Sequence, residues 1–484
     1  MKNILCMILL TVGSLRASAQ NESTVWVFGS NALNGDFNSD FQSGQMQIDS
    51  VSRNMNLYMT NSSMCDENGR ILFYTNGIYI ANALNDTIQN GAEINPGSFS
   101  NGWGNRGLPL PQAVVTINDP GNPNNYYLFH LVVDSNTNTS AKKLRFSKVD
   151  MTLASGLGAV TVKNQIVFYD SLIPANLVAV KHANGRDWWI VSHQNHSNLF
   201  HTILVSPSGI QGPFDQRIGK IMNWWGTAKF SPDGTKYASY DNTNGLQLIE
   251  FDRCSGSFYS DRYYAFQNDT FAATGVSFSP DSKLLYVSRN PVLVQVNTDS
   301  ISLEDGMDTV AVWDGFFSNQ IRTGFGCSEL GIDNKIYITP LGGTSVFHVV
   351  EMPDIPGSGC IVTQHAILTP GAVYTPPSFS NFSLGPLIGS VCDSIINIVD
   401  EINQPLFTLY PNPTTGISKI HSSSRSFQEA EIYIYNTIGQ LIYSDIIQSG
   451  TFEYFIDFRN YVSGIYSMQI VHDGKVNILS LVKL

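Results

Sequence analysis

Four histidines in one short stretch are the residues best suited to metal chemistry in this sequence. They are His182, His193, His196 and His201. A neutral imidazole is a common metal ligand, but side chains three residues apart on an extended strand, such as His193 and His196, point to opposite faces. The spacing therefore favours histidines that serve structural hydrogen bonds, and we expect no metal and no cofactor.

Two tryptophan pairs could offer flat surfaces to a sugar ring. They are Trp188–Trp189 and Trp224–Trp225. Aromatic side chains bury a large apolar area and usually serve the core. We expect one member of each pair to pack inside the protein, which leaves the other for ligand contact.

Four aspartates stand before short turns, as they would in calcium-binding loops. None is followed by the series of acidic ligands and the closing Glu that a calcium hand requires. Aspartates at these positions commonly cap turns by accepting backbone hydrogen bonds. We interpret Asp66, Asp233, Asp281 and Asp333 as turn-capping residues.

Catalytic residues cannot be assigned from the sequence. It contains no G-x-S-x-G nucleophile elbow. Two carboxylates far apart in sequence could still converge in the fold, as a glycosidase needs, but no pair stands out. Whether the protein is an enzyme stays open, with a non-catalytic role favoured.

A repeated segment shows which elements must position these residues. Each copy has a polar turn followed by a short aromatic-rich strand, and the copies recur about every 50 residues. Several strands per unit at such a period are typical of a β-propeller. The copies begin at Asn68, Asn124, Asn184, Asp233, Asp281 and Asp333.

Both ends of the repeat region carry an incomplete unit. Residues 25–29 have the character of a second strand without a first, and residues 377–382 that of a first strand without a second. Together they would complete one more blade and remove the exposed sheet edges. The sequence therefore predicts an all-β fold whose residues 20–382 form a seven-bladed propeller, with six blades as the alternative.

The texture of the chain changes after the propeller. Residues 383–404 have no clear period and are predicted to be a linker. In residues 405–484, polar and apolar residues alternate at 431–435 and 452–458, as in half-buried strands, and Asp473–Gly474 is a strong hairpin turn. This region is predicted to be a small Ig-like β-sandwich.

The cysteines beyond the first 19 residues are odd in number, which leaves at least one free thiol. They are Cys65, Cys254, Cys327, Cys360 and Cys392. Because Cys360 and Cys392 flank the end of the propeller region, they are the first choice for a disulfide.

Residues 1–19 are predicted to be a secretory signal peptide. Lys2 precedes an apolar run that is too short to span a bilayer, and a small-x-small sequence places the cleavage between Ala19 and Gln20. The net charge of −12 and the absence of basic runs argue against nucleic-acid binding. We expect no transmembrane segment.

Residues 405–484 resemble the type A C-terminal sorting domain of the type IX secretion system. The resemblance implies contact with the type IX secretion machinery and transport through the periplasm. It further implies release into the medium or attachment at the outer-membrane surface. The matching residues are Tyr410, Pro411, Asn412, Pro413, Gly416, Gly439, Gly464, Tyr466 and Lys483.

The propeller region resembles those of many secreted Bacteroidetes proteins, and its Phe-Ser-Pro-Asp segments at 230–233 and 278–281 are similar to WD-repeat and TolB-type propellers. This resemblance implies a fold and a location but no chemistry. We expect a binding or adhesion scaffold for an extracellular glycan or protein ligand. The alternative is a polysaccharide hydrolase or lyase with its site at the propeller axis.

A three-residue pattern of Asp, Ser or Thr, and an aliphatic residue resembles the O-glycosylation signal of exported Bacteroidetes proteins. The candidate acceptors are Ser50, Thr87, Ser171, Ser300, Thr309 and Ser394.

Overall fold

The computed structural model divides the chain into two compact units, Met1–Ser394 and Ile395–Leu484. It describes residues 21–29, 35–134, 140–222, 226–267, 275–340, 342–393, 407–422, 429–436, 440–448, 451, 453–472 and 475–484. The predicted signal peptide with Ala19 and Gln20 lies outside these ranges. Among the described residues, no helix has the length and apolar character that crossing a membrane would require.

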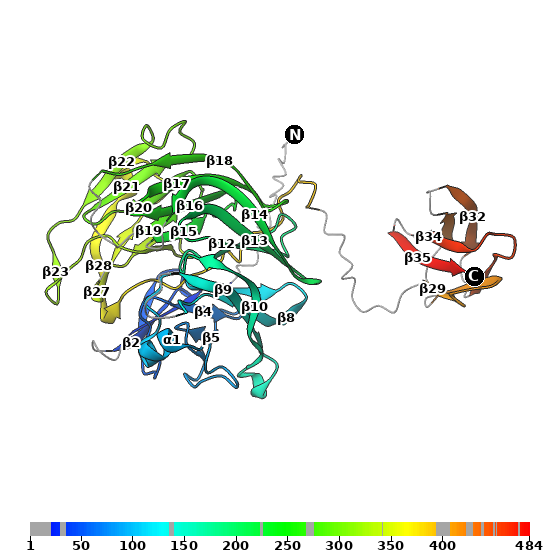
Figure 1. The fold of residues 1–484 in the computed structure, drawn as a ribbon, viewed down its shortest axis with the longest axis horizontal. Coiled ribbons are helices and arrows are strands. Elements are labelled where there is room, and N and C mark those ends of the chain that lie inside the picture. Colours follow the sequence, from blue (N-terminus) through cyan, green and yellow to red (C-terminus); the bar gives the residue numbers. More distant parts are fainter. Residues whose placement is uncertain are drawn as a thin grey trace, which may run out of the picture. The chain divides into compact units, whose positions relative to one another are not determined.

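The first unit is a succession of antiparallel sheets (Figure 1). The first two sheets have three strands: β1 (Val25–Phe28), β2 (Asp36–Asp40) and β3 (Gln47–Val51), then β4 (Ser62–Cys65), β5 (Ile71–Thr75) and β6 (Ile80–Asn82). The third contains β7 (Val114–Asp119), β8 (Asn122–His130), β9 (Ala141–Asp150) and β10 (Ala159–Leu172), and the fourth contains β11 (Val178–Lys181), β12 (Trp188–His193), β13 (Ser197–Ser206) and β14 (Gly209–Met222).

The later sheets repeat the four-stranded order. They are β15 (Gly226–Phe230), β16 (Lys236–Asp241), β17 (Gly245–Asp252) and β18 (Ser257–Tyr264); β19 (Gly275–Phe278), β20 (Leu284–Ser288), β21 (Val292–Asn297) and β22 (Met307–Val312); and β25 (Ser328–Leu330), β26 (Ile336–Ile338), β27 (Thr344–Val350) and β28 (Val362–Val373). Connecting segments hold α1 (Ser98–Trp103), three short 3₁₀ turns (η1, Gly104–Arg106; η2, Ala154–Gly156; η3, Gly357–Cys360) and a hairpin of β23 (Phe317–Ser318) and β24 (Ile321–Arg322).

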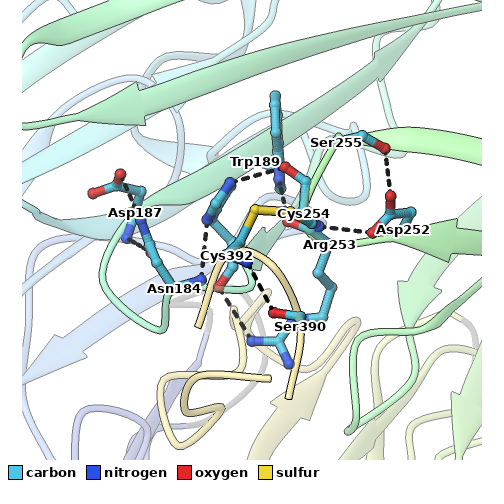
Figure 2. The surroundings of a disulfide bond; sticks show 10 residues. Asn184, Asp187, Trp189, Asp252, Arg253, Cys254, Ser255, Ser390 and Cys392 are labelled. Carbon is cyan, nitrogen blue, oxygen red and sulfur yellow. Dashed lines mark hydrogen bonds between the residues drawn. A yellow bond between two sulfur atoms is a disulfide. The ribbon is translucent and has the colours of Figure 1, made fainter. Parts of the chain in front are cut away.

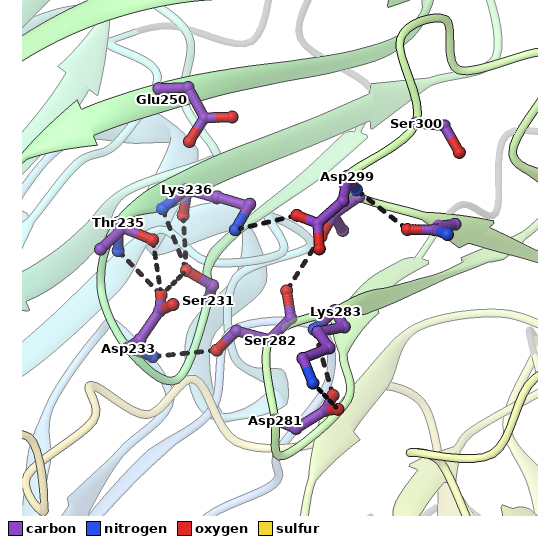
Figure 3. Close-up of polar contacts among 12 residues, drawn as sticks. Ser231, Asp233, Thr235, Lys236, Glu250, Asp281, Ser282, Lys283, Asp299 and Ser300 are labelled. Atoms are coloured by element: carbon purple, nitrogen blue, oxygen red, sulfur yellow. Dashed lines mark hydrogen bonds and ion pairs between the residues drawn. The ribbon is translucent and has the colours of Figure 1, made fainter.

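The repeated turns follow one geometry. Asp233 Oδ1 accepts hydrogen bonds from the Ser231 hydroxyl (2.5 Å) and the Thr235 N–H (2.9 Å). Asp281 does the same with the Ser279 hydroxyl at 2.7 Å and the Lys283 N–H at 3.1 Å. Figure 3 shows both turns and the hydrogen bond that joins them, from the Asp233 N–H to the Ser282 hydroxyl. The aspartates therefore cap turns, as the sequence predicts.

A left-handed residue completes each of these turns, which explains the glycines of the repeat. Gly69, Gly185 and Gly234 have φ of 75°, 73° and 73°, and Ser282 and Asn334 occupy the equivalent place at 66° and 64°. Where the repeat lacks glycine, the chain adopts the same turn at some steric cost.

The first strands of consecutive sheets lie next to one another, which gives a propeller-like arrangement. Contacts run from β1 to β4 and on through β7, β11, β15 and β19 to β25. The first sheet also meets the last described sheet of this unit, because Trp26 packs edge-on against Tyr337 with ring centroids 5.7 Å apart and Phe28 against Phe347 at 5.3 Å. Apolar residues of the first strands and their neighbours form the core.

The segment after β28 differs from the prediction. Residues 377–382 are not a β-strand, although Phe379 does pack near Trp26 (5.9 Å). The segment instead crosses the space bounded by the first strands, bonding to one sheet after another. Its contacts begin at Met59, whose carbonyl accepts from the Thr375 hydroxyl at 2.7 Å, and continue to Asn61, whose carbonyl accepts from the Ser378 N–H at 2.8 Å. We call residues 375–385 the central segment.

The predicted linker also begins within the first unit. The Leu387 N–H donates to Ala183 O at 2.8 Å, and Cys392 forms a disulfide with Cys254 (Figure 2). The prediction of a Cys360–Cys392 bridge was therefore wrong: Cys360 is buried and forms no disulfide, and the same holds for Cys65 and Cys327. Proximity along the chain misled that choice, because residues 383–393 return to the turn between β17 and β18.

The second unit consists of two antiparallel sheets around their own core. One contains β29 (Phe407–Tyr410), β30 (Ile417–Ser422) and β33 (Glu453–Asp457), and the other β31 (Glu429–Tyr435), β32 (Leu441–Gln448), β34 (Gly464–His472) and β35 (Lys475–Lys483). Buried residues of both sheets, including Phe407, Ile432 and Met468, form the core between them. The alternation in β31 places Ile432 and Ile434 inward, as predicted.

Candidate functional site

The main cavity of the described part of the first unit lies among the first strands. Its volume is about 500 Å³, and its walls come from β11, β15, β19 and β25, from nearby turns, and from the central segment. The apolar wall residues include Phe230, Ile332 and Leu384. A cavity of this size, lined by both apolar and polar side chains, has the dimensions of a small-ligand site.

A single ion pair lies at the inner end of the cavity. Lys229 on β15 donates to Glu329 on β25, and both side chains are largely buried. Burial raises the pKa of the Glu329 carboxyl, and the charge and hydrogen bond of Lys229 oppose this only in part. The pair is the charged floor of the cavity.

The central segment closes the same end. Residues Thr375, Pro376 and Ser378 line a much smaller void of about 20 Å³ beyond the ion pair, whereas residues 379–385 line the main cavity. Lys229 and Glu329 border both spaces. The main cavity is therefore blind at its inner end.

Several buried cations hold the central segment in place. Lys181 Nζ donates to Phe382 O at 2.8 Å, and Arg253 Nη2 donates to Gly385 O at 2.6 Å. The Asn381 amide adds a bond to Pro232 O at 2.7 Å. The fourth and fifth sheets thus fix the wall of the cavity that the segment forms.

The disulfide lies directly beside these contacts. Trp189 Nε1 donates to Arg253 O at 2.8 Å, and His182 Nε2 lies 2.9 Å from Cys254 O (Figure 2). Arg253 Nε donates to Lys181 O at 2.9 Å. The covalent link and the cations therefore fasten one region, where the chain leaves the central segment.

The four clustered histidines do not meet at one point. His182 serves the Cys254 carbonyl, and His196 is exposed. His193 is buried beside the Gln194 carbonyl (2.8 Å), and burial lowers its pKa to about 4. Among the described residues there is no cluster of three or more His, Cys, Asp or Glu side chains arranged to hold a metal ion.

His201 has a different environment, between two carboxylates. Its Nε2 lies 2.9 Å from Asp170 Oδ2 and its Nδ1 2.7 Å from Asp215 Oδ1. Burial alone would raise the pKa of Asp170, but hydrogen bonds from the Gln194 amide, the Ser171 N–H and His201 lower it. This trio joins β10 to β13 and β14 and lies away from the cavity lining.

Both described tryptophans of the predicted sugar platforms are core residues. Trp188 is 1% exposed and packs against Phe382, and Trp189 is 4% exposed. The prediction that one member of this pair would be accessible was wrong, because the central segment covers Trp188 and the Cys254 turn covers Trp189. Trp224 and Trp225 lie outside the described residues.

The predicted glycosylation acceptors lie on outer parts of the sheets. Ser50 on β3, Thr309 on β22 and Thr87 beyond β6 are exposed. Ser171 on β10 and Ser300 are partly buried, and the Ser171 hydroxyl donates to Ser140 Oγ at 3.0 Å. Ser394 lies outside the described ranges.

Among the predicted sorting-domain residues, Asn412 connects the segment after β29 to the last strand, β35. Asn412 Nδ2 donates to Ser480 O (2.6 Å), and Asn412 Oδ1 accepts from the Val482 N–H (2.9 Å). Pro411 O accepts from Ser418 Oγ at 2.8 Å. Of the others, Tyr410 and Gly464 are exposed, Tyr466 and Lys483 are buried, Pro413 and Gly416 lie in the turn before β30, and Gly439 is outside the described residues.

Sequence reasoning missed the residues that build the cavity. Lys229 and Glu329 are single charges within otherwise apolar inner strands, and that pattern was the available signal. Phe379 and Asn381 were noticed only as part of an incomplete strand. Their role depends on the path of the central segment, which no local pattern encodes.

The folded chain is an all-β protein with a propeller-like unit and a separate β-sheet unit. Residues 408–483 match the family described as the secretion system C-terminal sorting domain. This confirms the resemblance to type IX sorting domains, and the protein is therefore exported to the cell surface or the medium. No curated protein matches the chain.

Several solved structures are similar to this chain at low identity. A protein from Lactobacillus plantarum is 12% identical with a TM-score of 0.46, over 73% of this chain and 98% of that chain. A quinonprotein alcohol dehydrogenase-like protein from Bacteroides thetaiotaomicron is 9% identical with a TM-score of 0.40, over 74% and 78%. The Dos1 propeller is 11% identical with a TM-score of 0.35, over 66% and 86%.

Proposed function

We propose that the first unit is a non-catalytic binding module of an exported protein. The ligand would enter the main cavity described above, which we call the central cavity from here on. The observation that carries this proposal is the charge content of the cavity. Among its described lining residues, Glu329 is the one carboxylate, and it is paired with Lys229. Glycoside hydrolysis ordinarily needs two carboxyl groups across the scissile bond. An extracellular glycan or protein is the corresponding ligand.

For this function we propose a closed propeller of seven blades. Each blade is one of the three- or four-stranded sheets of the first unit whose strands are given above. The packing of β1 and β2 beside the last sheet supports closure. The second unit would be an Ig-like sandwich that acts as the sorting module. Residues 1–19 would be the signal peptide of the whole chain and would be cleaved. In this scheme the first unit alone contacts the ligand.

The test is to present the secreted protein to glycan and peptide arrays and to measure turnover of every bound ligand. Ile332→Trp would obstruct the cavity, because Ile332 lines it and is 41% exposed. The matched control is Ile355→Trp, on a residue that is 43% exposed and absent from the lining. We expect binding that only Ile332→Trp weakens, with no turnover. Turnover that is lost in Ile332→Trp would contradict a non-catalytic role.

We also propose O-glycosylation of the exposed acceptors Ser50, Thr87 and Thr309. Because all three side chains are exposed, an added glycan would extend into solvent without entering the core. Intact mass of the secreted protein tests this, with alanine variants at the three positions. A mass equal to that of the bare polypeptide would contradict it.

A further inference from the structure

The central cavity has no net charge on its described lining. Lys229 and Glu329 are its charged side chains, and each is the partner of the other. A ligand with a net charge would lose its hydration on entry and would find no uncompensated counter-charge. The cavity therefore selects against charged ligands.

The lining is nevertheless rich in uncharged hydrogen-bonding groups. Amides come from Asn21, Asn334 and Asn381, and an exposed hydroxyl comes from Ser383. Asn21 and Asn381 each donate one hydrogen bond to a backbone carbonyl, which leaves further hydrogen-bonding capacity on both amides. Amides both donate and accept, and so do hydroxyls, which suits a ligand with many hydroxyl groups.

Apolar surfaces face the same space. Phe230 and Phe379 are partly exposed within the lining, and Leu384 and Ile332 stand at its edge. A sugar ring combines hydroxyl groups at its rim with apolar C–H faces, so it can use both kinds of wall at once. An apolar ligand would cover the exposed Asn334 amide without giving it a hydrogen bond.

The closed inner end restricts how a chain can enter. The ion pair and Ser378 separate the cavity from the small void beyond it. A polymer cannot pass through, so only its end can be inserted.

We infer that the central cavity binds the end of an uncharged saccharide chain. This inference rests on the proposed binding function and narrows its ligand. Lys229 and Glu329 stay paired beneath the terminal sugar, and the Asn and Ser side chains receive its hydroxyl groups.

The first experiment titrates the full secreted protein with neutral trisaccharides (cellotriose, xylotriose, maltotriose and triacetylchitotriose) and with trigalacturonic acid. We expect at least one neutral trisaccharide to bind at least tenfold more tightly than the acidic one. Ile332→Trp should weaken that binding tenfold or more, and Ile355→Trp should change it less than twofold. Ser383→Trp provides a second obstruction if Ile332→Trp fails to fold, because Ser383 is an exposed lining residue.

The second experiment uses the polysaccharide from which the bound trisaccharide derives. It compares binding to equal masses of that polymer before and after partial depolymerisation. Binding per mass should rise in proportion to the number of chain ends. Equal binding by the intact polymer would overturn insertion of an end, and tighter binding of trigalacturonic acid would overturn the preference for neutral ligands.

The outcomes separate this inference from the proposed function. If no neutral trisaccharide binds but a peptide binds in a manner sensitive to Ile332→Trp, the saccharide inference fails and the binding module remains. If array ligands bind equally to wild type and Ile332→Trp, the cavity is not the site and both fail.

Discussion

The two units of this protein hold their last residues in place by different means. In the first unit, the central segment is held by side chains of several sheets and then by the Cys254–Cys392 disulfide. In the second unit, the Thr414 N–H donates to Val482 O and the Leu484 N–H to Thr414 O, both at 2.8 Å. Charged side chains and a covalent bond therefore hold the end of the first unit, whereas main-chain hydrogen bonds hold the end of the second unit.

This difference teaches that the stability of the two units should respond to different conditions. Buried charged groups and a disulfide make the first unit sensitive to pH and redox state. The backbone hydrogen bonds that hold the end of the second unit depend on neither pH nor redox state. We expect two thermal transitions, and the second unit's transition serves as an internal reference for the predictions below.

Lower pH should separate the two transitions most strongly. Burial lowers the pKa of His130 to about 3 and those of His193 and His348 to about 4. The unfolded chain, with histidine pKa near 6.5, then binds more protons, so stability is full above pH 6.5 and falls as the pH drops toward 4. At pH 5 each of these histidines would lower the free energy of unfolding of the first unit by about 2 kcal/mol, which is roughly 6 kcal/mol for the three together.

Calorimetry of the secreted protein between pH 8 and pH 5 tests this expectation. His193→Gln, which retains a donor for the Gln194 carbonyl, should reduce the loss by about 2 kcal/mol. A first transition that does not move with pH would show that burial of these histidines is not maintained.

Removal of the disulfide should have the next largest effect. The bridge spans a sequence separation of 138 residues, and cross-linking a loop of that length is expected to stabilise the folded unit by about 5 kcal/mol. The double variant with Cys254→Ser and Cys392→Ser should lower the free energy of unfolding of the first unit by that amount and leave that of the second unit unchanged. Cys65→Ser, at a buried cysteine that forms no disulfide, is the control for substitution alone.

Loss of Lys229 should destabilise the first unit by about 3 kcal/mol, because it leaves Glu329 buried without its counter-charge. Lys229→Met is the variant, measured by denaturant unfolding. Lys229→Met with Glu329→Gln should recover much of the loss. If the double variant is no more stable than the single one, the pair is not the source of the effect.

A change in the second unit should be smaller and should reverse the pattern. Asn412→Ala removes two hydrogen bonds to β35, which should lower the second transition by about 1–2 kcal/mol. Tyr410→Ala, at a side chain that is 71% exposed, should have little effect. A shift of the first transition instead would contradict the independence of the two units.

The sequence was sufficient to predict the repeating sheets and the sorting module. Turns such as Asp233–Gly234 are encoded locally, because a capping carboxylate and a left-handed residue determine the backbone path within four residues. The alternation of polar and apolar residues in β31 is likewise visible within a few residues. These features appear where the sequence places them.

The cavity and the disulfide could not be predicted in the same way. Lys229 and Glu329 are separated by 100 residues, and Cys254 meets Cys392 only because the central segment crosses the unit first. Such contacts depend on the closure of the whole sheet arrangement, which short-range patterns do not specify. The same closure buries Trp188 and Trp189, which looked suitable for ligand contact.

The path of the central segment has a consequence for biosynthesis. Residues 375–393 emerge from the ribosome after the described sheets of the first unit, yet residues 375–382 pack inside it. A nascent chain that ends before residue 375 would expose the inner strands to water and would lack the Cys392 thiol. The unit should therefore mature only after its translation is complete, and shortened products should be prone to aggregation or proteolysis.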